Sequence, residues 1–230
     1  MAEALGFAQL KTAVAGSAAA FRSVSRLEPA GGPGDKIFPP TYAGGVYATE
    51  KRRVGTEDGS EEVVECVLLD SVQSQANRME EALLEAIRAE RLQLPLIEVD
   101  FSGVDLLKPV GNVTSLQAPH RLADAILRDS LLEDGTPFRT SEYARQWGAA
   151  NLFNATPIYR LCPTALVFGL WGSPDKPGGL GAKFERTIVS EIVGVDCLPT
   201  DRRLGFRIDP LEIKAAAPGP CIHGVGRGAF

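Results

Sequence analysis

The chain has 230 residues, a formal net charge of −5, 44% hydrophobic and 23% charged residues. This composition is ordinary for a globular protein, and the length suits one large domain or a domain with insertions. It contains no apolar run of about eighteen residues, so no membrane span is expected. The Ala-rich segment at residues 13–20 lacks a basic flank and a long apolar core, so we do not expect a signal peptide.

The charge is uneven along the chain. Residues 1–100 carry 10 Lys/Arg and 16 Asp/Glu, a balance of −6, whereas residues 101–230 carry 14 and 13, a balance of +1. A local basic groove can bind phosphate despite a negative total, so the charge counts against nucleic-acid binding without excluding it.

Cysteine and histidine usage argues against a metal centre. The four cysteines are widely spaced with no CxxC, and only two histidines occur. Such spacing does not suit a compact zinc site and fits a reducing compartment. We therefore expect no metal, no cofactor and a cytoplasmic location.

The first part of the chain predicts strands joined by turns. In chain order we expect a short helix or loose lead-in over residues 1–16, a strand over 21–27, turn chemistry over 28–34, a strand over 46–53, a polar hairpin tip over 56–62 and a returning strand over 63–69.

The stretch VLLDSVQSQANRMEEALLEAI, residues 67–87, is predicted to run from this buried strand into a helix that ends near Arg91. Asp70, Ser71 or Ser74 is a suitable N-cap. The predicted inward face consists of Met79, Ala82, Leu83, Ala86 and Ile87. The first turns carry several polar side chains, which suit recognition of an anionic polymer or form the solvated face of an ordinary amphipathic helix.

The second half predicts a mixture of helices and strands. We expect a strand over residues 96–101, a loop with Lys108 over 102–118, a helix over 118–132, a connector over 135–141, a helix over 143–153, a buried strand over 164–169, a flexible loop over 171–183, strands over 184–196 and 204–208, and a weakly structured tail over 215–230. This order predicts an α+β fold.

The common catalytic motifs are missing. The sequence has no GxxxxGK[ST], no GxGxxG opening a helix and no GxSxG. GGLGAK at residues 178–183 lacks the following Ser/Thr of a P-loop. A cluster of Glu185, Glu191 and Asp196 is more simply a set of solvent-facing partners for Lys183 and Arg186. We therefore predict no catalytic residue.

Four blocks together carry a resemblance to a known family: FPPTYAGGVYATEKR (38–52), LLDSVQSQANRMEEALLEA (68–86), APHRLADAILRDS (118–130) and LVFGLWGSPDKPGGLGAKFERTIVSEIVGVD (166–196). In combination they resemble the CRISPR-associated RAMP-superfamily protein of type I-U systems, also called type I-G, which is the Cas-seven-like backbone subunit of the Cascade surveillance complex. The resemblance covers about residues 20–210.

The resemblance implies a single domain over residues 1–230, with a core at about 18–210 and a tail at 211–230. It implies a modified RRM fold, meaning a ferredoxin-like antiparallel sheet with helices on one face and inserted finger or thumb segments. It also implies a longer C-terminal region than the ending GVGRGAF provides.

The implied function is to bind CRISPR RNA (crRNA) as a backbone subunit and present it for pairing with target DNA. The implied partners are further copies of the chain in a helical filament, a large subunit, a fused Cas-five/Cas-six-type subunit and a recruited helicase-nuclease. The protein itself is not expected to be an enzyme, because DNA cleavage and guide processing belong to other components.

Within the matching blocks, residue type suggests the RNA contacts, because the protein need only grip the shape and backbone of the guide. The candidate RNA-binding residues are Ser71, Gln73, Gln75, Asn77, Arg78, His120, Arg121, Lys183, Arg186, Arg52, Arg53 and Arg128. For each one, a surface salt bridge or hydrogen bond is the alternative interpretation.

Two other functions stay open at this point. One is a RAMP-superfamily endoribonuclease that processes CRISPR RNA with His120 and either Lys183 or Arg186. It needs a second strong acid or base that the sequence does not identify. The other is a metabolic α/β enzyme, which predicts no bound RNA.

Overall fold

The computed structural model describes residues 5–55, 59–104, 110–171 and 183–197. The chain forms two compact units, residues 1–38 and residues 39–230. Each unit is therefore described separately. The expectation of one domain over the whole chain stays a prediction.

The described part of the first unit, residues 5–38, contains one helix. Helix α1 spans Phe7–Ala15, as predicted, and begins where the Gln9 side chain accepts a hydrogen bond from the Gly6 backbone N–H at 2.7 Å. No residue from 5 to 38 is buried. The predicted strand over 21–27 is wrong, because these residues have no regular structure. Its alternating apolar residues have no neighbouring strand among the described residues of this unit.

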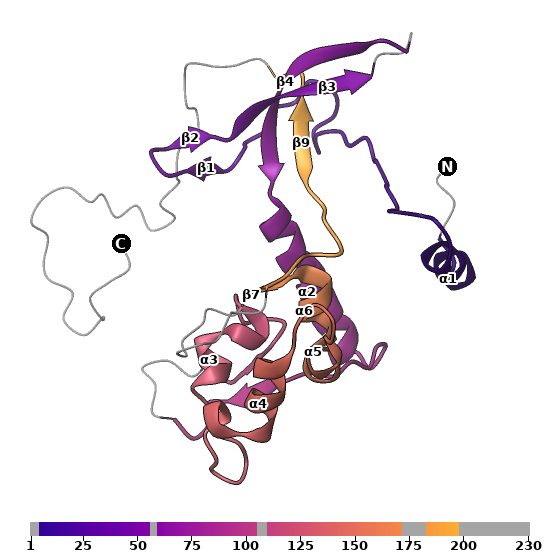
Figure 1. Ribbon diagram of the computed structural model, residues 1–230. Coiled ribbons are helices and arrows are strands. Elements are labelled where there is room, and N and C mark those ends of the chain that lie inside the picture. The colour runs from indigo at the N-terminus through magenta and orange to yellow at the C-terminus, as the bar shows by residue number, and fades with distance from the viewer. Residues whose placement is uncertain (1–4, 56–58, 105–109, 172–182, 198–230) are drawn as a thin grey trace, which may run out of the picture. The chain divides into compact units, whose positions relative to one another are not determined.

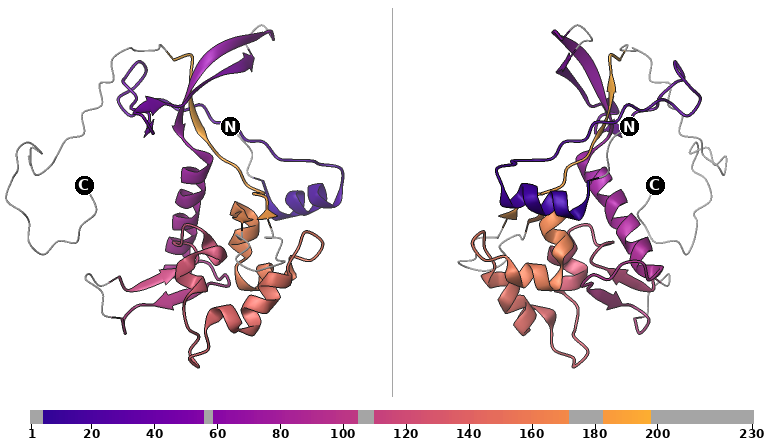
Figure 2. Two further views of the ribbon diagram at one scale, coloured as in Figure 1. Left: turned by 60° about the vertical axis from the view of Figure 1, so that its left-hand side comes forward. Right: turned by 90° about the vertical axis from the view of Figure 1, so that its right-hand side faces the viewer.

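The second unit opens with a sheet that contains the predicted hairpin (Figure 1). Strands β1 (Thr41–Tyr42) and β2 (Val46–Tyr47) pair with each other, and β3 (Thr49–Gly55), β4 (Glu61–Asp70) and β9 (Ile192–Val195) form an antiparallel sheet in the order β3-β4-β9. Thr49 lies opposite Val67, and Cys66 lies opposite Val195. Both views of Figure 2 show β9 beside β4, although more than a hundred residues separate them in the sequence.

Helix α2 follows directly from the central strand β4 and spans Val72–Arg88 (Figure 1). Ser71 is its N-cap, as predicted, and its hydroxyl accepts a hydrogen bond from the Ser74 backbone N–H at 3.2 Å. The predicted inward face is right only in part, because Met79, Leu83, Ala86 and Ile87 are half-buried whereas Ala82 is exposed. The buried positions are Ala76, Glu80 and Leu84, spaced four residues apart, so the helix is turned to place a carboxylate inside.

The other described elements of this unit are short. They are β5 (Glu98–Asp100), β6 (Asn112–Thr114), the 3-10 turns η1 (Arg121–Ala123) and η2 (Phe138–Thr140), α3 (Ala125–Arg128), α4 (Glu142–Ala149), α5 (Thr156–Leu161), α6 (Pro163–Phe168), β7 (Leu170–Trp171) and β8 (Lys183–Phe184). Their shared core contains Leu122, Phe138, Ala144, Ala150, Ile158, Cys162, Ala165, Leu170 and Phe184.

Three predicted elements of this group differ in the structure. The strand predicted over 164–169 is wrong, because α6 occupies it, with Pro163 at the first helical position and Gly169 after the last. The helix predicted over 118–132 is split. Arg121 has a positive φ of 51°, which breaks the helix, and Asp124 then caps the four-residue α3. The loop predicted over 102–118 contains β6.

The described residues confirm the α+β class, with antiparallel sheets and several helices. The ferredoxin-like RRM arrangement stays a prediction, since the widest sheet among the described residues has three strands. Lys108, the strand over 204–208 and the tail from 211 lie outside the described residues. In the described part of the chain, no helix is both long and apolar enough to cross a membrane.

Candidate nucleic-acid interface

A polar network occupies the junction between β4 and α2. Asp70 ends the strand, and its Oδ2 accepts hydrogen bonds from Gln75 Nε2 at 2.6 Å and Arg78 Nε at 2.8 Å. On the far side of Gln75, its Oε1 accepts a hydrogen bond from Ser190 Oγ at 3.0 Å. Hydrogen bonds from Ser74 first, and then from Gln75 and Arg78, hold the pKa of Asp70 below its usual range.

This network separates the predicted residues of α2 into two groups. Ser71 and Gln75 are half-buried and their side chains are engaged, in the cap and in the network. Gln73, Asn77 and Arg78 are exposed. The Arg78 side chain is 69% exposed although it pairs with Asp70. These three side chains are therefore the part of the predicted set that α2 presents to solvent.

The predicted basic residues of β3 are tied to carboxylates. Arg52 donates to Glu50 and, through Nη1, to Glu191 at 2.6 Å. These pairs raise the pKa of Arg52, and the Arg52 hydrogen bond lowers the pKa of Glu191. Arg53 is more exposed and pairs with Glu61 on β4 at 3.5 Å. Arg52 thus joins β3 to the residue before β9, while Arg53 lies on a mixed-charge surface.

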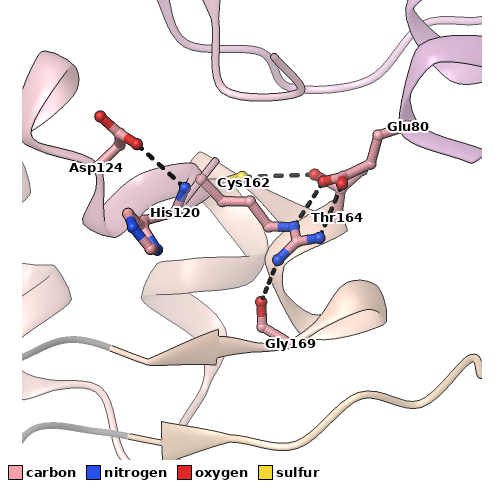
Figure 3. Close-up of polar contacts among 7 residues, drawn as sticks. Glu80, His120, Asp124, Cys162, Thr164 and Gly169 are labelled. Atoms are coloured by element: carbon pink, nitrogen blue, oxygen red, sulfur yellow. Dashed lines mark hydrogen bonds and ion pairs between the residues drawn. The ribbon is translucent and has the colours of Figure 1, made fainter. Parts of the chain in front are cut away.

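Arg121 is directed into the protein. Its Nε and Nη2 donate to the two oxygens of Glu80 at 2.6 and 2.7 Å, and its Nη1 donates to the Gly169 carbonyl at 3.1 Å (Figure 3). Its guanidinium also lies 5.7 Å from the centre of the Phe168 ring. Burial raises the pKa of Glu80, and the bonds from Arg121 oppose this shift. All three guanidinium nitrogens of Arg121 therefore donate hydrogen bonds inside the protein.

His120 and Arg128 lie on either side of the Asp124 cap. The Asp124 carboxylate accepts from the backbone N–H of His120 at 3.1 Å and from that of Ile126 at 3.0 Å, and His120 is exposed. Arg128 is half-buried, and its Nε lies 3.5 Å from Asp129.

The last two predicted residues lie on or beside β8. Lys183 is exposed and pairs with Glu185 at 2.8 Å. Arg186 is also exposed and makes no ion pair with a described residue. Its side chain passes over Gly169, since a Cβ added at Gly169 lies only 2.9 Å from Arg186 Cγ.

A shallow groove runs beside the exposed face of α2. It has a volume of about 290 Å³, and the Leu116–Pro119 segment forms its other wall. Asn77 lies on the helix side, and Pro119 immediately precedes His120. Glu81, Glu85 and Arg88 also line the groove. The two carboxylates outnumber the one cation, which makes the groove less suited to phosphate than the Arg78 end of the helix.

Sequence patterns do not reveal the carboxylates that hold these cations. They indicate Asp70 only as a cap and Glu191 only as a solvent-facing charge, and they do not single out Glu80. A local signal exists for Asp70, which lies eight residues before Arg78 at the start of the helix. The other two pairs join residues 41 and 139 positions apart. In the described ranges, no group of His, Cys, Asp and Glu could hold a metal ion.

The chain matches a known protein family over most of its length. Residues 22–199 match the family described as CRISPR-associated protein GSU0053. The chain belongs to this CRISPR-associated family. The match includes the β3–β4 hairpin, α2 and β9. No curated protein and no solved structure matches the chain.

Proposed function

We propose that this CRISPR-associated protein is a crRNA-binding backbone subunit of a type I Cascade complex, of the RAMP superfamily and the type I-G, formerly I-U, class. Copies of the chain polymerise along the guide RNA and present it for pairing with target DNA. The protein has a structural, non-enzymatic role beside the large subunit, the fused Cas-five/Cas-six-type subunit and a recruited helicase-nuclease.

The observation that carries the proposal is the exposed polar surface of α2, consisting of Gln73, Asn77 and Arg78, in a chain of a CRISPR-associated family. Amide and guanidinium groups suit hydrogen bonds to phosphate and to the 2′-OH of RNA. These contacts carry no sequence information, as expected when base pairing with the guide reads the target.

The pairing of cations with carboxylates fits this role. Arg52, Arg53 and Lys183 each have a carboxylate partner within 3.5 Å. Such pairs reduce the attraction of the free chain for arbitrary nucleic acid, because the local net charge stays low. Binding then depends on a few well-placed donors. Arg78 and Arg186 suit this task, because both are exposed and Arg186 pairs with no carboxylate among the described residues.

The test is to express the chain with its CRISPR array and partner subunits and to purify the particle by size exclusion. We expect an A260/A280 ratio typical of a ribonucleoprotein, and sequencing of the bound RNA should return protected guides. The Gln73→Ala/Arg78→Ala variant should lower RNA occupancy. Arg88→Ala, on the same helix and also exposed, is the matched control and should not.

A nucleic-acid-free monomer or dimer, obtained with array and partners present, contradicts the proposal and favours a metabolic enzyme. A chain that shortens guide RNA by itself contradicts the non-enzymatic role and favours the endoribonuclease.

A further inference from the structure

We infer that Asp70 is a positioning residue that orients Arg78 so that both terminal amino groups of its guanidinium face a backbone phosphate of the bound RNA. The inference rests on the proposed function and adds a residue that itself touches no RNA. The evidence for it is a difference among the arginines in which guanidinium nitrogens form hydrogen bonds inside the protein.

Arg78 differs in this respect from two other arginines that carboxylates hold. Only its Nε is bonded, to Asp70 Oδ2 at 2.8 Å, and within the described ranges neither Nη1 nor Nη2 has a hydrogen-bond partner. Arg121 uses Nε and Nη2 on Glu80 and Nη1 on Gly169. Arg52 likewise uses Nε on Glu50 and Nη1 on Glu191.

The two Nη groups of Arg78, which have no partner among the described residues, have a suitable geometry to bind an oxyanion. A guanidinium presents its two Nη groups as a planar fork that binds two oxygens of a phosphate at once. The side chain is 69% exposed, so a polymer can reach this fork from solvent. With Nε fixed on a carboxylate, the plane of the fork is fixed too, which lowers the entropy lost when the phosphate binds.

Asp70 is itself held in place, as a positioning group must be. Its carboxylate side chain is only 14% exposed. The same Oδ2 accepts from Gln75 Nε2 at 2.6 Å, and Gln75 Oε1 accepts from Ser190 Oγ at 3.0 Å. The series of hydrogen bonds therefore runs from the segment before β9, through Gln75 and Asp70, to the exposed Arg78. In this arrangement Gln75, with both ends of its amide engaged, supports Asp70.

A carboxylate beside an arginine can instead only neutralise it. The two roles predict opposite results for removal of Asp70. If Asp70 only neutralises Arg78, its loss makes the surface more positive and RNA affinity rises. If it positions Arg78, its loss frees the guanidinium to rotate and affinity falls in spite of the more favourable charge.

The experiment measures binding of the full chain to a fluorescein-labelled single-stranded RNA with the sequence of one repeat–spacer unit, by fluorescence anisotropy at several salt concentrations. We expect Arg78→Ala to weaken binding about tenfold, which is the range for a charge-assisted hydrogen bond. Asp70→Ala should weaken it several-fold. Asp70→Asn retains an acceptor oxygen and should recover most of the affinity.

A double-mutant cycle distinguishes positioning from a general structural effect. Asp70→Ala placed in the Arg78→Ala protein should cause no further loss, because Asp70 acts through Arg78. The matched control is Glu85→Ala, which removes a carboxylate paired with Arg88 on the same helix at 3.5 Å. It makes the same change in charge, and affinity should stay equal or rise.

Two results contradict this inference alone, and a third contradicts the proposed function as well. Tighter binding by Asp70→Ala assigns Asp70 a neutralising role, and additive losses in the double variant assign it a structural one. If the unaltered protein binds the RNA with no salt dependence and no response to Arg78→Ala, or does not bind it, the proposed function fails as well. Thermal denaturation of each variant checks that every protein in the binding comparison is folded.

Discussion

Arg121 and Glu80 form a two-pronged ion pair that joins α2 to the turn before α3. The two N···O distances are 2.6 and 2.7 Å, and the side chains are 12% and 2% exposed. A buried charge without its partner is far more costly than the intact pair is favourable. The pair therefore fixes which face of α2 is buried and, with it, the direction in which Gln73 and Arg78 project.

Removing one partner of this pair should destabilise the protein strongly. We expect Arg121→Ala and Glu80→Ala each to lower the free energy of unfolding by about 3–5 kcal/mol, because each leaves an uncompensated buried charge. Urea denaturation followed by circular dichroism measures this change. Replacing both residues with apolar ones, Glu80→Leu and Arg121→Met, should recover part of the loss. A loss below about 1 kcal/mol for both single variants contradicts the structural role given to the pair.

The start of α2 could be predicted from the sequence, whereas its orientation could not. Ser71 precedes a helical pattern and has the side chain of a good cap, so the signal is local. Glu80 is buried because Arg121, 41 residues later, provides its counter-charge. Apolar periodicity contains no information on such a partner, so it finds the half-buried flank around Leu83 and misses the fully buried row that contains Glu80 and Leu84.

The error at residues 164–169 has a different cause. TALVFG contains β-branched and apolar residues that suit a buried strand. The stronger signals are Pro163 and Gly169, which begin and follow the helix. Of the candidate interface, residue type alone identifies Gln73, Asn77 and Arg78. Residue type cannot separate these three residues from Gln75 and Arg121, whose side chains form hydrogen bonds inside the protein.

Gly169 should not tolerate a side chain. Its φ is +90°, and a Cβ there meets Arg186 Cγ at 2.9 Å and the Phe184 carbonyl at 3.4 Å. Its own carbonyl also accepts from Arg121. We expect Gly169→Ala to cost about 1–3 kcal/mol of unfolding free energy.

The matched control for this change is Gly148→Ala in α4. A Cβ at Gly148 meets nothing within 4 Å. Alanine in a helix is favoured over glycine by about 1 kcal/mol, so this variant should be equally or more stable. Thermal or urea denaturation of both variants checks the pair, and equal effects at the two positions refute the conformational argument for Gly169.

The stability of the protein should depend on pH through Asp70. The folded state holds the pKa of this carboxyl below its ordinary value near 3.8. Its contribution is complete above the unfolded pKa and is lost as the pH falls through the folded pKa, because the unfolded chain binds the proton first. Unfolding free energies measured between about pH 2 and pH 6 should therefore fall more steeply for the unaltered protein than for Asp70→Asn. Parallel curves would show that the network at the start of α2 does not stabilise the ionised carboxylate.

His120→Ala should leave guide production and RNA content unchanged. The exposed imidazole has no hydrogen-bond partner among the described residues. The hydrogen bonds of His120 come from its backbone, whose N–H donates to Asp124 and whose carbonyl accepts from Ala123 N–H. A catalytic histidine is typically oriented by a third group, and the described residues hold no such group against the His120 ring. Co-expression with the array, followed by measurement of the length and amount of bound RNA, compares His120→Ala with the unaltered chain. Accumulation of unprocessed precursor RNA in this variant, with normal folding, would assign the chain the endoribonuclease activity in place of the structural role.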